Sequence, residues 1–123
     1  MGTSAMVGII KEDGKIHASY VHYDGYVSHT GKMLIEHYNT PETAAQVSEG
    51  GYLSALERDY EVSRERSVNS DMMVSFDNKH AFVSQHTGFC TDYVYLFDGE
   101  TWEYAETYGP MTFNKVVDVS NNV

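Results

Sequence analysis

The sequence predicts an α+β fold in which an antiparallel sheet of hairpins, with about six or seven strands, carries roughly two or three short helices on one face. Asp-Gly pairs between β-rich runs stand at positions 13–14 and 98–99, and apolar residues recur at helical spacing between these two hairpins. The chain has 123 residues, of which 41% are apolar, so it is long enough to bury a core without disulfides. We therefore expect one domain spanning residues 1–123, with residues 1–5 disordered or left over from cloning.

The first hairpin is expected from residues 5–11 and 15–23, two β-rich runs that Asp13-Gly14 separates. An Asp-Gly pair is typical of a two-residue hairpin loop, because both positions tolerate a positive φ. With this loop, Ile9 is expected opposite Ala18 and Val7 opposite Tyr20. The residues that share the predicted core face are then Val7, Ile9, Ile16, Ala18, Tyr20 and His22.

Two helices are expected after the first hairpin. Beyond Gly25, an amphipathic helix of about three turns is predicted by apolar residues at helical spacing, namely Val27, Leu34, Ile35 and Tyr38. Thr40-Pro41-Glu42 predicts the start of a second helix, with Thr40 as its N-cap, and Gly50-Gly51 predicts its end. Residues 52–56 are expected to add another turn, and the polar stretch 58–70 is interpreted as a solvated connection or a frayed helix.

Strands return in the second half of the chain. The predicted strands are residues 72–76 and 80–84 around an Asp77-Asn78-Lys79 turn, 93–97 and 101–104 around Asp98-Gly99, and 112–119. With Asp98-Gly99 as a two-residue loop, Phe97 is expected to pair with Glu100, Tyr95 with Trp102 and Tyr93 with Tyr104. The aromatic residues that then share one face are Tyr93, Tyr95, Phe97, Trp102 and Tyr104. Such a face is either core or an exposed binding platform, and the less apolar opposite face favours the core interpretation.

The charge of the chain argues against one class of partner. Eighteen acidic and eight basic residues give a net charge of −10, whereas nucleic-acid binding requires clustered positive charge. Residues 71–123 hold eight acidic and two basic residues, a net charge of −6. This surface would attract a basic partner, including a DNA-binding protein, or it only keeps the protein soluble.

Other sequence features limit the location and the chemistry. Cys90 is the only cysteine, which excludes an intrachain disulfide and fits a reducing compartment. No secretion signal and no long apolar run is present, so we expect a soluble protein that is not exported. No phosphate-binding glycine loop and no G-x-S-x-G motif occurs, so no cofactor and no catalytic residue is predicted.

The densest polar cluster is His22-Tyr23-Asp24-Gly25-Tyr26, followed by His29 and His37. His and Asp at a strand-to-helix turn can act as metal ligands or as an acid/base pair, and glycine lets the backbone approach a ligand. Because no metal-ligand spacing is present, no metal is predicted; alternatively, Asp24 caps or shapes the turn while His22 forms hydrogen bonds inside the fold. The candidate binding residues are His22, Tyr23, Asp24, Gly25, Tyr26, His29, Glu100, Trp102 and Glu103.

Four segments together resemble a family of small phage and prophage proteins. These are residues 22–26, 31–40, 50–56 and 95–102, and they are similar to the family patterns H-W-D-G-Y-P, L-L-x-H-Y-x-T, G-D-L-S-S-L and Y-L-F-x-D-G-x-W. Order and spacing agree over the greater part of the chain, but the middle segment does not match. The sequence departs from the family at Tyr23, where Trp is usual, at Val27 in place of Pro, and at Gly51-Tyr52.

The resemblance implies a phage-encoded accessory protein that acts in the host cytoplasm, and it implies no mechanism. Our leading hypothesis is a non-enzymatic protein that binds and inhibits or redirects a host defence or transcription factor. It would use the acidic C-terminal half or the segment His22–Tyr26, without binding nucleic acid or a membrane. One alternative is a small-molecule or nucleotide binder or hydrolase that uses His22, Asp24, Tyr26 and His29, and another is a minor virion component. The oligomeric state stays open, a dimer included.

Overall fold

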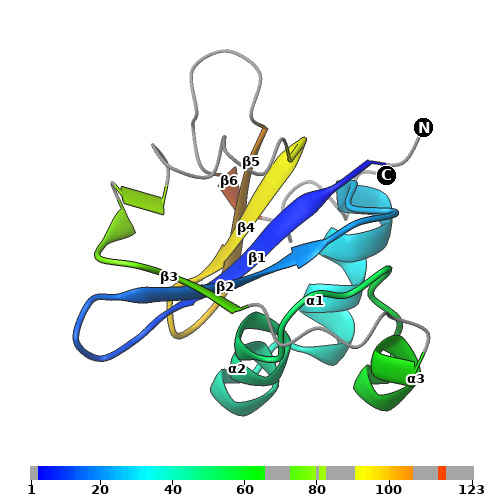
Figure 1. Cartoon of the computed structure of the whole chain (residues 1–123), viewed down its shortest axis with the longest axis horizontal. Helices are drawn as coiled ribbons and strands as arrows, with labels where there is room; N and C mark the ends of the chain where they lie inside the picture. Colours follow the sequence, from blue (N-terminus) through cyan, green and yellow to red (C-terminus); the bar gives the residue numbers. More distant parts are fainter. Residues whose placement is uncertain (1–2, 66–72, 80, 83–90, 107–113, 116–123) are drawn as a thin grey trace.

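A six-stranded sheet with helices packed on one face forms the centre of the computed structural model (Figure 1). The structure describes residues 3–65, 73–79, 81–82, 91–106 and 114–115. The predicted α+β class is confirmed. The strands are β1 (Ala5–Ile10), β2 (Ile16–Val21), β3 (Met73–Phe76), β4 (Tyr93–Phe97), β5 (Trp102–Glu106) and the two-residue β6 (Asn114–Lys115). The helices are the π-helical turn η1 (Val27–Gly31), α1 (Lys32–His37), α2 (Pro41–Glu49) and α3 (Tyr60–Glu65).

The sheet is mixed, and this is a departure from the antiparallel sheet expected from the hairpins. Its strand order is β3-β2-β1-β4-β5-β6, and the central strands β1 and β4 are parallel. Parallel neighbours need a long crossover, and here β2, the helices and β3 all lie between β1 and β4 in the sequence. Turn signals in the sequence identify only strands that follow each other, so they could not reveal this pair.

The first hairpin forms, but its predicted register is wrong by one residue. Ile9 pairs with His17 rather than with Ala18, because the loop includes Glu12 as well as Asp13-Gly14. Gly14 has a φ of 87°, the left-handed conformation that closes a three-residue loop. A shift of one residue moves every side chain of a strand to the other face. Ile16, Ala18 and Tyr20 therefore lie on the face of Met6, and His17, Ser19 and Val21 lie on the face of Val7 and Ile9.

The aromatic hairpin β4–β5 is shifted by two residues from its predicted register, which leaves the faces unchanged. Phe97 pairs with Trp102 and Tyr95 with Tyr104, so the loop runs from Asp98 to Thr101. Inside that loop the Asp98 carboxylate accepts hydrogen bonds from the backbone N–H groups of Glu100 and Thr101, both at 2.9 Å. The five aromatic residues therefore still share one face, as the sequence predicted.

The two helices predicted after the first hairpin are present, but the helical turn predicted after the second one is not. η1 and α1 together cover the predicted first helix, and α2 begins where Thr40 was predicted as its N-cap. The Thr40 hydroxyl accepts from the Thr43 N–H, and the Thr43 hydroxyl accepts from the Thr40 N–H, both at 3.2 Å. The extra helical turn expected at residues 52–56 is wrong, because Leu53 forms a parallel bridge with Val21 instead.

Downstream of β3, residues 81 and 82 do not form the strand that was predicted for residues 80–84. Lys79, Ala81 and Phe82 are helical, and the Asn78 side chain accepts a hydrogen bond of 2.8 Å from the Ala81 N–H. Asparagine is a strong N-cap, so it starts a helical turn at this position instead of a hairpin loop. Parts of several predicted features lie outside the described residues, namely residues 1–2, 66–70, 72, 80, 83–84, Cys90, 112–113 and 116–119.

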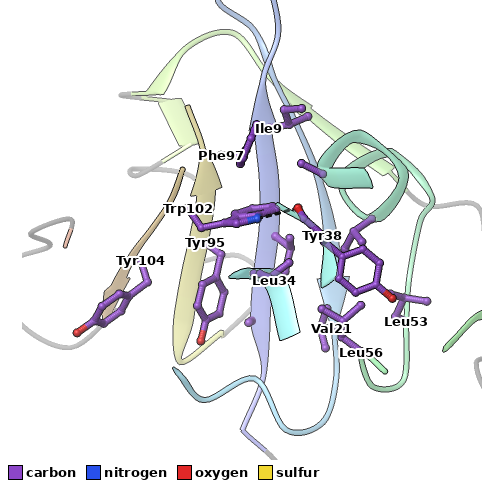
Figure 2. Close-up of a cluster of buried hydrophobic side chains, with 14 of the residues drawn as sticks. Ile9, Val21, Leu34, Tyr38, Leu53, Leu56, Tyr95, Phe97, Trp102 and Tyr104 are labelled. Atoms are coloured by element: carbon purple, nitrogen blue, oxygen red, sulfur yellow. Dashed lines mark hydrogen bonds between the residues drawn. The ribbon is translucent and has the colours of Figure 1, made fainter. Parts of the chain in front are cut away.

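The larger core lies between the sheet and the helices, and Trp102 is at its centre (Figure 2). Trp102, Phe97 and Tyr95 are fully buried. Figure 2 shows the indole of Trp102 pointing toward Tyr38, whose carbonyl oxygen accepts a hydrogen bond of 3.0 Å from the indole Nε1. The core interpretation of the aromatic face is therefore confirmed. The opposite face of the sheet forms a second cluster of buried residues, which contains Met6, Ile16, Ala18, Phe76, Phe82, Val94, Leu96 and Ala105.

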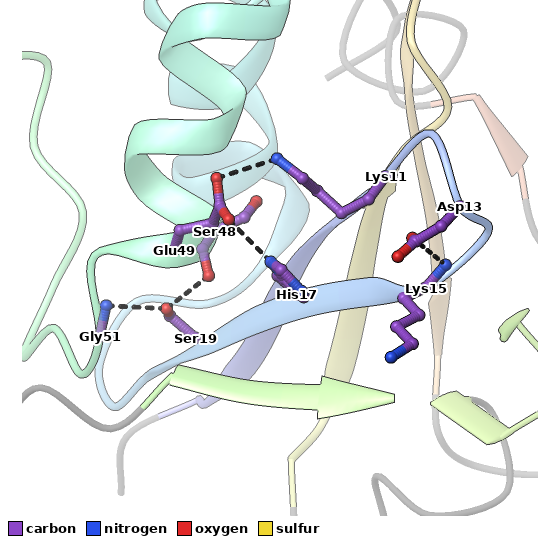
Figure 3. A network of polar contacts seen from close by, with 8 residues as sticks. All are labelled: Lys11, Asp13, Lys15, His17, Ser19, Ser48, Glu49 and Gly51. Atoms are coloured by element: carbon purple, nitrogen blue, oxygen red, sulfur yellow. Dashed lines mark hydrogen bonds and ion pairs between the residues drawn. The ribbon is translucent and has the colours of Figure 1, made fainter. Parts of the chain in front are cut away.

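A polar network fastens the end of α2 to β2 (Figure 3). The buried Ser19 hydroxyl donates to the Ser48 carbonyl at 2.7 Å and accepts from the Gly51 N–H at 2.9 Å. Above it, Glu49 contacts His17 Nδ1 at 2.7 Å and Lys11 Nζ at 3.2 Å. The hydrogen bond from His17 holds the pKa of Glu49 below its usual range, and the ion pair with Lys11 adds to this effect. The Ser19 hydroxyl thus pairs a carbonyl of the last turn of α2 that has no partner within the helix, and the Glu49 contacts hold the helix end against the first hairpin.

The two neighbouring serines should respond oppositely to the same substitution. Ser19→Ala is expected to lower the free energy of unfolding by about 1–3 kcal/mol, because it leaves a buried N–H and a buried carbonyl without their partner. The Ser48 hydroxyl is buried and has no hydrogen-bond partner among the described residues. Ser48→Ala should therefore leave stability unchanged or raise it by about 1 kcal/mol. Urea unfolding of both variants tests the pair, and an equal loss in both would contradict it.

Candidate functional site

The turn His22–Tyr26 follows β2 directly, and a neighbouring segment holds its backbone. The N–H of His22 donates to the Leu53 carbonyl at 3.0 Å, and the N–H of Tyr23 donates to the Ser54 carbonyl at 2.7 Å. These bonds continue the parallel bridge beside the end of β2. The turn is therefore part of the folded framework, at the place where the sequence predicts a strand as far as residue 23 and then a strand-to-helix turn.

Gly25 is needed because the backbone approaches β1 closely here. A Cβ at position 25 would lie 2.8 Å from the carbonyl carbon of Ser4 and 2.9 Å from the Cβ of Ala5. The Gly25 N–H donates to the Thr3 carbonyl, and the Gly25 carbonyl accepts from the Tyr95 hydroxyl, both at 2.7 Å. Burial raises the pKa of Tyr95, so this hydroxyl stays protonated and continues to donate. Gly25 was predicted to let a ligand approach, but the structure places the protein's own backbone there.

Asp24 shapes the turn by its backbone. Its φ of 58° makes it the only non-glycine residue with a positive φ in the described part of the chain. Asp tolerates this conformation better than most residues. The Asp24 carbonyl accepts a hydrogen bond of 2.6 Å from the Thr30 hydroxyl, which ties the turn to η1. This arrangement agrees with the alternative that Asp24 has a structural role.

The imidazoles of this region bind different partners and do not converge. His22 Nδ1 lies 3.1 Å from the Tyr20 hydroxyl, whereas His29 Nε2 lies 2.9 Å from the Leu56 carbonyl. A carbonyl only accepts, so His29 carries its proton on Nε2. His37 lies at the end of α1, where Nε2 is 3.8 Å from the carboxylate of Glu36. Within the described residues, no three His, Cys, Asp or Glu side chains gather in a way that could hold a metal ion.

A surface strip of four rings runs across the end of β2. We call Tyr52, Tyr20, His22 and Tyr23 the aromatic strip. Tyr52 stacks on Tyr20 with 5.7 Å between ring centroids and 28° between planes. Tyr20 lies 5.7 Å from His22, which meets Tyr23 edge-on at 4.3 Å. The first three rings are partly buried, and Tyr23 is 50% exposed.

Sequence reasoning singled out half of this strip. It named His22 and Tyr23 as binding residues, but it assigned Tyr20 to the core and Tyr52 to a helical turn. The parallel bridge between Val21 and Leu53 sets the two tyrosines beside each other. A parallel bridge between distant segments leaves no signal in a single sequence.

The other predicted binding residues lie elsewhere. Trp102 is fully buried, so it is not part of a binding surface. Glu100 is exposed in the β4–β5 loop, and Glu103 is partly buried with its carboxylate 3.9 Å from Lys79 Nζ. The structure therefore does not bring these residues together with the His22–Tyr26 turn.

Two surface clefts occur away from the turn. One of about 520 Å³ lies where both hairpin loops meet the start of α2 and is lined by Lys11, Pro41 and Phe97, among others. The other, of about 540 Å³, is polar and includes His37 and Arg58 in its lining. Neither cleft contains a residue of the His22–Tyr26 turn.

The fold and the surface together define an acidic α+β protein that presents a fixed aromatic strip. Comparison of the chain with family models, with curated proteins and with solved structures gave no match. None of the helices in the described part of the chain is long and apolar enough to cross a bilayer.

Proposed function

We propose that this chain is a phage-encoded accessory protein that binds a host protein without catalysing a reaction, and so inhibits or redirects that protein in the host cytoplasm. The phage origin rests on the resemblance of residues 22–26, 31–40, 50–56 and 95–102 to the family of small phage and prophage proteins. The binding role rests on the surface at the His22–Tyr26 turn.

The observation that carries the binding role is the exposure of two tyrosines on a fixed turn. Tyr23 is 50% and Tyr26 is 39% exposed, and they are the only large hydrophobic side chains exposed within the described residues. Tyrosine is enriched at binding hot spots because its ring supplies contact area and its hydroxyl supplies a hydrogen bond. A backbone that is already fixed reduces the entropy lost on binding.

The ligand-binding alternative has less support from this geometry. A hydrolase or nucleotide site at the turn would need His22, Asp24 and His29 to face a common ligand. Instead, His22 bonds to Tyr20 and His29 bonds to the Leu56 carbonyl. Both histidines thus serve contacts inside the protein.

The experiment is affinity capture from the natural host with a tagged protein, followed by mass spectrometry of every stoichiometric partner. The double variant Tyr23→Ala/Tyr26→Ala should lose at least tenfold in partner capture, since a hot-spot tyrosine contributes about 2 kcal/mol. Its thermal unfolding should stay close to that of the wild type, because both side chains are exposed.

The triple variant Glu100→Lys/Glu103→Lys/Glu106→Lys tests the other proposed contact surface. If capture depends on these carboxylates and not on the tyrosines, the acidic C-terminal half is the contact surface. A nucleotide or small molecule that co-purifies without any protein would overturn the binding role in favour of a ligand site. Recovery of the protein from purified particles would instead select a virion component.

A further inference from the structure

The aromatic strip has the geometry of a stacking surface. Its rings form a bent row from Tyr52 through Tyr20 and His22 to Tyr23, with neighbouring centroids between 4.3 and 5.7 Å apart, and Tyr52 also lies 6.2 Å from His22. The row is held in place at its backbone, because the Leu53 N–H donates to the Tyr20 carbonyl at 2.9 Å. Tyr23 is the exposed ring of this row, and it can accept another flat group with little further loss of conformational entropy.

Two classes of macromolecule stack flat groups on aromatic rings. Single-stranded nucleic acids stack their bases, but the proteins that bind them surround the rings with positive charge that neutralises phosphate. Basic proteins stack arginine guanidinium groups, which the negative faces of aromatic rings attract. The sign of the protein's charge therefore decides between the two classes.

The charge of this protein favours the basic partner. The whole chain carries a net charge of −10, and residues 71–123 alone carry −6. A field of this sign repels phosphate and raises the local concentration of cations. No arginine or lysine belongs to the strip, and the segment from Ser19 to Gly31 contains none.

We propose that the aromatic strip binds an arginine-rich basic segment of a partner protein by stacking of guanidinium groups on Tyr52, Tyr20 and Tyr23. This inference rests on the proposed function, because it names the chemistry of the partner that the turn would contact. The net negative charge draws the segment in, and the rings select arginine over lysine. Lysine has the same charge but lacks the flat group that stacks.

The test uses defined probes instead of the unidentified partner. Two peptides of equal length and charge, one of alternating Arg and Gly and one of alternating Lys and Gly, are titrated into the full-length protein. Affinity is measured by calorimetry, and the ring resonances of the tyrosines are followed by NMR. We expect the arginine peptide to bind about fivefold more tightly than the lysine peptide and to shift the ring resonances of the strip.

Two variants separate stacking from charge. Tyr23→Leu/Tyr52→Leu should reduce the binding of the arginine peptide to the level of the lysine peptide, whereas Tyr23→Phe/Tyr52→Phe should keep the preference. If the leucine variant does not fold, two results still test the proposal: the shifts of the tyrosine ring resonances in the wild-type protein, and the arginine preference of the phenylalanine variant. Equal affinity for both peptides would overturn the proposal, as would an arginine preference that survives in the folded leucine variant.

A single-stranded oligothymidylate serves as the probe of the other class. Tighter binding of this oligonucleotide than of the arginine peptide would overturn the proposal in favour of nucleic acid. The experiments also distinguish a failure of the arginine proposal from a failure of the proposed function. If host-partner capture needs Tyr23 but no arginine preference exists, the partner chemistry is wrong and the proposed function stands. If the arginine preference exists but host-partner capture does not depend on Tyr23 or Tyr26, the aromatic strip binds arginine but is not the surface that contacts the host partner.

Discussion

Trp102→Ala is expected to lower the free energy of unfolding by about 3–5 kcal/mol, the range for removal of a buried large aromatic side chain. Trp102 is fully buried, its ring centroid is 5.2 Å from that of Phe97, and its Nε1 donates to the Tyr38 carbonyl. The substitution removes the contact between β5 and the end of α1 and leaves a cavity between sheet and helices.

The measurement for this prediction is urea unfolding followed by far-UV circular dichroism, because Trp102 is the only tryptophan and the variant loses its fluorescence. Trp102→Phe is the control, since it keeps a ring in the core but removes the N–H donor. Trp102→Phe should lower the free energy of unfolding by less than Trp102→Ala does. A loss below about 1 kcal/mol for Trp102→Ala would mean that the ring does not hold sheet and helix together.

Tyr38, the acceptor for Trp102, also links the helix end to the segment before α3. Its hydroxyl donates to the Glu57 carbonyl at 2.6 Å. Burial raises the pKa of Tyr38 to about 12, so the hydroxyl remains a donor at neutral pH. The loss of Trp102 is therefore expected to loosen this connection as well as the core.

Gly25→Asn is the second substitution with a large expected effect. We expect it to lower the free energy of unfolding by about 3 kcal/mol, because a Cβ would meet the Ser4 backbone and Ala5 Cβ of an adjoining buried strand. Neither neighbour is the end of a flexible side chain, so the turn itself must move. Partner capture should fall with it, since the turn carries Tyr23 and Tyr26.

The same substitution at Gly14 is the matched control. Gly14 has a φ of 87°, and a Cβ there would have no atom within 4 Å. Asparagine tolerates a positive φ, so Gly14→Asn should cost less than about 1 kcal/mol and leave partner capture intact. Thermal and urea unfolding of both variants measure the two losses of stability. If Gly25→Asn is as mild as Gly14→Asn, the close approach to β1 does not constrain the turn.

Local signals in the sequence predicted several features correctly because the groups that determine them lie near each other in the chain. Thr40 caps α2 through Thr43, three residues away, and this bond needs no tertiary contact. Alternation along β4 and β5 placed the five aromatic residues on one face, and a shift of two residues in the register could not change that. In the first hairpin the register differs from the predicted one by a single residue, and there the predicted face was wrong.

The sequence by itself thus determined the fold class, the start of α2 and the existence of both Asp-Gly hairpins. Only the tertiary structure decided the parallel pair β1–β4, the role of Gly25 and the aromatic strip. The physical reason is that each of these depends on segments far apart in the chain. β1 meets β4, Gly25 meets Ser4, and Tyr20 meets Tyr52 only when the chain has folded.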